Sequence, residues 1–138
     1  MRDAAWAFVW KFLSGWVDPL LVACWLVSVW SQGRTMRSSR KVLAPAIGLA
    51  VSLTVVYIVR GLHVWPAHPL FPSGHEAIAA SIATSLALLD RRWMIISAGL
   101  AALLALSLVL SGYHSWVDVI GSLLLCPVLT YACHVRLP

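Results

Sequence analysis

Charged residues are scarce in this chain, and acids are the scarcest of them. Only five of its 138 residues are aspartate or glutamate, and charged residues of both signs make up 11%, against about 25% in an ordinary soluble domain. Hydrophobic residues account for 61% of the chain. A soluble protein of this size could not bury so much apolar surface inside itself. The composition therefore excludes a soluble domain and predicts a single integral membrane domain over residues 1–138.

Cysteine is also rare, and close-spaced metal ligands are missing. The three cysteines lie within apolar segments, so we expect reduced packing residues rather than disulfides; they are Cys24, Cys126 and Cys133. His75, His114 and Asp118 lack the short spacing typical of a metal site. We therefore expect neither a metal nor another cofactor.

Long apolar segments dominate the rest of the chain. A helix of 18 residues is about 27 Å long, close to the thickness of the hydrocarbon layer. Four segments meet this length or come near it, at residues 42–59, 74–90, 93–111 and 115–135. With a first span before them, they predict an all-α polytopic membrane bundle of about five transmembrane helices.

The first span is harder to place. The apolar run over residues 4–31 is too long for one straight span, and Asp18-Pro19 interrupts it. One arrangement is a tilted helix over residues 12–30. The other, which we favour, is an interfacial helix over residues 4–16 that leads into a short span.

Basic residues gather in three short regions between or after the apolar segments. They are Arg34, Arg37, Arg40 and Lys41 in the loop 32–41, Arg91 and Arg92 in the turn 90–92, and Arg136 near the end of the chain. Alternating spans put these regions on one side of the membrane, which the positive-inside rule makes cytoplasmic. Membrane orientation thus explains the net charge of +5, and no nucleic-acid partner is expected. The loop 60–73 and the turn 111–115 then share the outer, periplasmic face of a membrane of the bacterial inner-membrane type.

The loop 60–73 leads into the motif Phe71-Pro72-Ser73-Gly74-His75, directly before an apolar segment. Serine is a good N-cap, and glycine lets a ligand approach the backbone closely. The first N–H groups of the following helix lack intrahelical partners, so Ser73, Gly74 and His75 form a candidate anion site. A structural alternative stays open, because Ser73-x-x-Glu76 is also a capping box.

The turn 111–115 carries His114, and Asp118 follows four residues later. This spacing places both on one face of a helix. A carboxylate that accepts from one imidazole nitrogen leaves the other nitrogen free to attack. A His-Asp pair near a helix end is often only structural, but acids within membrane segments are costly, which favours a functional Asp118.

These residues together resemble the type 2 phosphatidic acid phosphatase family, the membrane lipid phosphate phosphatases. The resemblance covers a phosphatase-like core at about residues 42–135, and the middle motif, residues 71–75, is complete. The last motif of the family reads Ser-Arg, five residues, His, three residues, Asp. Ser107, His114 and Asp118 match it, as does Gly112, whereas Leu108 stands at the arginine position.

The first motif of the family, Lys, six residues, then Arg-Pro, is less well matched. Its nearest counterpart here is Arg60, seven residues, then His68-Pro69. Arg60 is the one fixed cation that the sequence places near the predicted site. Its structural alternative is a residue that snorkels from a helix end. His63 and His134 are interpreted as a polar loop residue and a bystander.

The resemblance implies a mechanism without a metal. His114 would attack phosphorus and form a phosphohistidine, Asp118 would stabilise the imidazolium, and His75 would protonate the leaving oxygen. Ser73 and Gly74 would bind the phosphate oxygens, with Arg60 and His68 as further phosphate-binding residues. The implied function is hydrolysis of a lipid phosphate or polyprenyl diphosphate.

Three other functions stay open. Leu108 in place of arginine predicts a slow enzyme, an altered phosphate site or no phosphatase activity. A weak or inactive relative of the family would bind phospholipid headgroups or a partner protein. A lipid-linked phosphotransferase would use every one of the same residues. Beyond the lipid phosphate and the membrane lipids no partner is identified, and a homo-oligomer or a subunit of a larger complex is also open.

Overall fold

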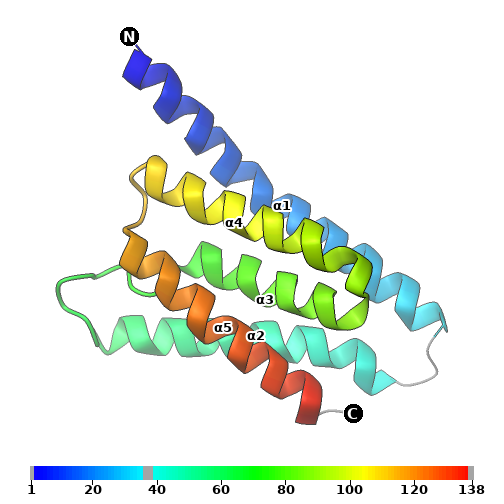
Figure 1. Ribbon diagram of the computed structural model, residues 1–138. Helices are drawn as coiled ribbons and strands as arrows, with labels where there is room; N and C mark the ends of the chain where they lie inside the picture. Colours follow the sequence, from blue (N-terminus) through cyan, green and yellow to red (C-terminus); the bar gives the residue numbers. More distant parts are fainter. Residues whose placement is uncertain (1, 36–38, 137–138) are drawn as a thin grey trace.

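The described part of the chain folds into a bundle of five α-helices (Figure 1). The computed structural model describes residues 2–35 and 39–136. Its elements are α1 (Arg2–Thr35), α2 (Ser39–Gly61), α3 (Gly74–Leu89), the short 3-10 helix η1 (Arg91–Trp93), α4 (Met94–Leu110) and α5 (Trp116–Arg136). No strand occurs within these two described ranges. The predicted all-α bundle is therefore confirmed, and α2 to α5 lie where the apolar segments predicted them.

Four of the helices are long and apolar enough to cross a membrane. The candidate spans are Phe8–Ser31, Leu43–Gly61, Arg91–Leu110 and Trp116–Arg136. Large apolar side chains on their outer surfaces are exposed, such as Ile95 at 79% and Leu124 at 69%. Such a surface is stable against lipid, in a structure whose helices satisfy their own backbone hydrogen bonds.

α3 is the central helix and contacts all four of the others. In Figure 1 it lies between α4 on one side and α2 and α5 on the other. Its 16 residues give about 24 Å, shorter than a typical span. Small residues line its faces and are almost fully buried, including Ala77, Ala79, Ala80 and Ser81. Small side chains let neighbouring helices approach closely, so the start of α3 is held on all sides.

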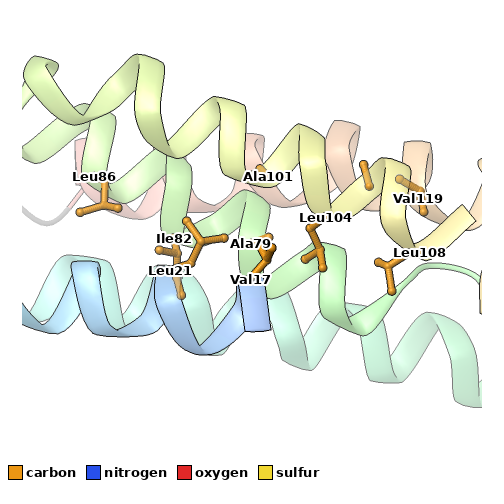
Figure 2. Close-up of a cluster of buried hydrophobic side chains, with 10 residues drawn as sticks. Val17, Leu21, Ala79, Ile82, Leu86, Ala101, Leu104, Leu108 and Val119 are labelled. Atoms are coloured by element: carbon orange, nitrogen blue, oxygen red, sulfur yellow. The ribbon is translucent and has the colours of Figure 1, made fainter. Parts of the chain in front are cut away.

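An apolar cluster joins α1, α3, α4 and α5. Figure 2 shows its members along these helices; the labelled ones are Val17, Leu21, Ala79, Ile82, Leu86, Ala101, Leu104, Leu108 and Val119. Leu108 is only 1% exposed. The residue at the arginine position of the last motif is thus a packing residue at the edge of the core.

α1 corrects the arrangement that we favoured for the first span. It is one helix of 34 residues that continues through Asp18 and Pro19 without a break. A broken helix would expose backbone groups to lipid, which costs more than the one hydrogen bond that proline removes. Gly15, one turn before the proline, has open space around it. The separate interfacial helix over 4–16 is therefore wrong, and the first turns of α1 instead project past the ends of the other helices (Figure 1).

The two connections that carry the motifs meet at one end of the bundle. Figure 1 shows the α2–α3 loop and the α4–α5 turn side by side there, with η1 and the end of α5 at the opposite end. The Ser73 N–H donates across the two connections to the Asp118 carbonyl over 2.9 Å. Within the predicted basic loop 32–41, α1 extends to Thr35 and α2 begins at Ser39, while Arg37 lies outside the described residues.

Candidate active site

Ser73 is the N-cap of α3, and hydrogen bonds connect it to α5. Its side chain caps the helix by accepting from the Glu76 N–H over 3.3 Å. The Ser122 hydroxyl donates to the Ser73 carbonyl over 2.7 Å, and Ser73 itself is fully buried. The capping box is only half formed, because Ser73 N–H donates to Asp118 and both carboxyl oxygens of Glu76 lack a partner among the described residues. Ser73 thus has a structural role in this state, and its phosphate-binding role stays a prediction.

A glycine turn ends α4 and brings the chain to His114. Gly112 has φ +76°, in the left-handed region that glycine adopts at little cost. Its N–H donates to Val109 over 3.0 Å, and the Tyr113 N–H donates to Leu108 over 3.0 Å. This pair of bonds is a Schellman motif, which satisfies the last carbonyls of α4 and reverses the chain. The turn therefore explains why a glycine stands two residues before the histidine.

The structure brings His75 and His114 together. Their ring centroids lie 6.3 Å apart, with 62° between the ring planes. His75 is exposed on the first turn of α3, whereas the His114 side chain is only 8% exposed. One small ligand could contact both rings from opposite sides. The two histidines that the sequence singled out thus share one site, with different access to solvent.

Asp118 lies between two histidines. Its Oδ2 is 3.6 Å from His114 Nδ1, and its Oδ1 is 3.9 Å from His68 Nδ1. His68 Nδ1 is also 3.2 Å from the Ser115 hydroxyl. His68 therefore lies against the Asp118 carboxylate, and its role in binding phosphate stays a prediction. Because His114 Nδ1 faces Asp118, its Nε2 is the nitrogen that remains for chemistry.

Ser115 and Asp118 form a complete capping box at the start of α5. Asp118 Oδ2 accepts from the Ser115 N–H over 2.9 Å and from its hydroxyl over 2.8 Å. In return, the Asp118 N–H donates to Ser115 Oγ over 3.3 Å. The pattern Ser-x-x-Asp signals such a box, so Ser115 could have been found in the sequence. These bonds orient the carboxylate toward His114 and limit its movement.

Burial sets the protonation of His114. It lowers the pKa of the imidazole below its ordinary value, and this effect exceeds the opposing effect of the Asp118 carboxylate. The positive charge of Arg60, and a charge on His75 when it is present, lower this pKa further. The neutral imidazole, whose unprotonated ring nitrogen carries a lone pair, is therefore favoured near neutral pH.

Two hollows flank the histidine pair, and both histidines line each of them. The first hollow has a volume of about 310 Å³ and is also lined by Tyr57, Arg60, Leu70, Gly74 and Ile78. The second has a volume of about 320 Å³ and is also lined by Lys11, Ser14, Gly15, Leu108 and Tyr113. The site thus opens on two sides, with one fixed cation in each hollow.

Arg60 holds the loop that precedes α3. Its Nη2 donates to the Leu70 carbonyl over 3.0 Å and to the Pro72 carbonyl over 2.7 Å. The side chain therefore does more than snorkel toward the surface. It fixes the path of the motif loop and places a positive charge in the first hollow, beside Gly74 and the two histidines.

Lys11 is the cation that the motifs did not reveal. It comes from α1, which precedes the phosphatase-like core predicted at about residues 42–135. A lysine inside an apolar run was the available signal, because a charge there is costly unless it serves a function.

No group of three or more His, Cys, Asp or Glu side chains in residues 2–35 and 39–136 is arranged to hold a metal ion.

Gly121 on α5 provides a test of how the motif loop is packed. A Cβ at this position would overlap the Phe71 ring. We expect Gly121→Ala to displace the start of the motif and to destabilise the fold by about 1–3 kcal/mol. Gly99→Ala on α4 is the matched control, because nothing lies within 4 Å of its added Cβ. Thermal unfolding in detergent would show a lower Tm for the first variant only, and equal Tm values would contradict this packing.

Comparison with known families supports the same assignment over a longer stretch than the motifs do. The family model described as the PAP2 superfamily matches residues 4–137. This range includes α1 from residue 4 onward and all four of the other helices. The comparisons with curated proteins and with solved structures found no match.

Proposed function

The chain belongs to the PAP2 superfamily, whose members are generally phosphatases, and on this premise we propose that it hydrolyses lipid phosphates or diphosphates at the outer membrane face. The observation that carries the proposal is the pair His75 and His114, with ring centroids 6.3 Å apart and a hollow on either side. Asp118, 3.6 Å from His114, supports the division of roles between the two rings.

In the first step His114 acts as the nucleophile. Its Nε2 attacks phosphorus in line, and the bond from phosphorus to the leaving oxygen breaks with its electron pair on that oxygen. His75 donates a proton to the leaving oxygen. The carboxylate of Asp118 stabilises the positive charge that develops on the His114 ring, at a distance of 3.6 Å.

In the second step His75 acts as a general base instead of a general acid. It takes a proton from water, which attacks the phosphohistidine, and the bond from phosphorus to Nε2 breaks and restores His114. The exposure of His75 suits this exchange with water, whereas the buried His114 is protected from it.

The first hollow suits the transferred phosphoryl group. The first N–H groups of α3, those of Gly74 and His75, have no acceptor within the helix, and a helix N-terminus favours an anion. Arg60 adds a positive charge in the same hollow. Backbone donors and a fixed cation of this kind stabilise the charge of a phosphoryl group in transfer.

A trapping experiment tests the proposal. Purified protein in detergent is incubated with a radiolabelled lipid phosphate and quenched, and the protein is analysed for acid-labile, alkali-stable phosphohistidine. Label on the wild type with release of inorganic phosphate supports hydrolysis. Label that passes to an added alcohol instead supports the phosphotransferase. Lipid binding without label would contradict catalysis and favour a protein that binds headgroups.

The pH dependence of the reaction follows from the low pKa of His114. Protonation removes its lone pair, so kcat/KM falls as the pH drops through the pKa of the free enzyme. Burial lowers that pKa, so we expect the acid limb below the ordinary histidine value of about 6.5. Initial rates between about pH 4 and 8 check this, and an acid limb above the ordinary value would show that His114 is not the neutral nucleophile.

A further inference from the structure

Two acids near the site take no part in the proposed mechanism. Glu76 follows His75 on α3 and is fully buried, yet neither oxygen of its carboxyl group has a hydrogen-bond partner among the described residues. Asp18 on α1 is half-buried, and its Oδ1 also lacks a partner there. The two carboxyl groups interact electrostatically with each other. Because buried polar groups without partners are costly, this pair of acids within the bundle indicates a functional role.

Helical spacing brings Asp18 toward His75. Ser14 and Gly15 of α1 line the second hollow together with His75. Asp18 comes four residues after Ser14 and three after Gly15, so it lies on the same face of α1, one turn farther along the helix. The Asp18 carboxyl group accordingly interacts electrostatically with the His75 imidazole. The face of α1 that borders the site thus carries an acid directed at the histidine on α3.

Fixed positive charges surround His75. Arg60 and Lys11 each line a hollow with it. A nearby positive charge disfavours the imidazolium, which is the form that donates a proton to the leaving oxygen. His114 also faces the His75 ring, but it has its own carboxylate in Asp118. The acids that remain for His75 are the two on α1 and α3.

We propose that Asp18 is the counter-ion of His75 and favours the protonated ring that the first step requires, while Glu76 stays neutral. Two ionised carboxyl groups that interact in an apolar interior repel each other, so one of the pair keeps its proton. Glu76 is fully buried whereas Asp18 is half-buried, so the proton stays on Glu76. Each histidine then has its own carboxylate. The inference rests on the proposed function, and Asp18 is a positioning residue because it acts through His75.

The test uses two substrates whose leaving groups differ in their need for a proton. Decyl phosphate releases a basic alkoxide that needs the proton of His75, whereas p-nitrophenyl phosphate releases a stable phenolate without one. We expect Asp18→Asn to lower kcat/KM by about 10- to 100-fold for decyl phosphate and by less than about threefold for p-nitrophenyl phosphate. Asp18→Glu, which keeps the charge, should restore most of the loss. Asp90→Asn, the same substitution at the opposite end of the bundle, should change neither rate.

Equal losses on the two substrates would overturn the proposal, as would no loss on either. Nitrogen NMR of histidine-labelled protein separates this failure from failure of catalysis, because it needs no turnover. In the His114→Ala protein, Asp18→Asn should lower the protonated fraction of His75 near neutral pH, and an unchanged fraction would count against Asp18 even if no phosphate is released. Infrared spectra test the partner acid: the C=O stretch of a protonated carboxyl group should disappear in Glu76→Gln, and its persistence would contradict a neutral Glu76.

Discussion

His114→Ala abolishes phosphate release, with an expected loss in kcat of about 10³-fold or more. The reason is chemical rather than structural, since the variant lacks the ring nitrogen that forms the proposed covalent intermediate. The side chain is 8% exposed and packs at the end of the bundle, so its truncation should lower the Tm by only a few degrees. Initial rates on a lipid phosphate, with thermal unfolding of the same samples, check both parts.

The matched control is His134→Ala. His134 lies at the opposite end of the bundle, on α5, where its Nε2 is 3.3 Å from the Ser85 hydroxyl. This variant loses a half-buried imidazole of the same size but leaves the site intact, so its rate should stay close to that of the wild type. Unchanged phosphate release in His114→Ala would contradict the phosphohistidine mechanism outright.

Much of the fold follows from the sequence, because hydropathy and helix-end residues are local signals. The bilayer sets the length of each span, and α2 to α5 begin and end near the limits of the apolar runs. Because successive spans cross the membrane in alternating directions, every second connection lies at the same end of the bundle. The loop before His75 and the turn before His114 are two such connections. The number of spans therefore predicts that the two histidines lie at the same end, and the 6.3 Å between their ring centroids confirms this.

The path of α1 could not be predicted from the sequence in the same way. Asp18-Pro19 is a strong signal for a helix break in water, but lipid penalises an open backbone more than it penalises a proline. α1 therefore remains one helix and carries Lys11 to the site. A position so distant in sequence from His75 and His114 gives no spacing pattern from which its place could be inferred.

The individual roles of the polar residues also depend on tertiary contacts. The pattern Ser73-x-x-Glu76 predicts a reciprocal cap, yet the Ser73 N–H donates to Asp118 instead and leaves the Glu76 carboxyl group without a partner among the described residues. His68 has no helical register with Asp118, but the loop places its Nδ1 3.9 Å from the carboxylate. Such contacts depend on how two loops pack, which neither periodicity nor a motif encodes.

Asp118→Asn should lower kcat by about 10²- to 10⁴-fold while leaving the fold intact. The Asp118 carboxylate faces His114 Nδ1 at 3.6 Å and favours the tautomer with the proton on that nitrogen. An asparagine amide can instead donate to Nδ1, which moves the ring proton to Nε2 and removes the lone pair that attacks phosphorus. Because the same Oδ2 position accepts from the Ser115 N–H, an amide nitrogen there loses that capping bond, and we expect an accompanying loss of about 0.5–2 kcal/mol of stability.

Two further measurements separate this role of Asp118 from helix capping. The carboxylate raises the pKa of His114, so its loss should move the acid limb of kcat/KM to lower pH. Ser115→Ala removes the hydroxyl that donates to Asp118 over 2.8 Å but keeps the carboxylate. It should therefore cost about 0.5–2 kcal/mol of stability and leave the acid limb in place. A rate for Asp118→Asn within about tenfold of the wild type, with an unshifted acid limb, would mean that Asp118 only caps α5.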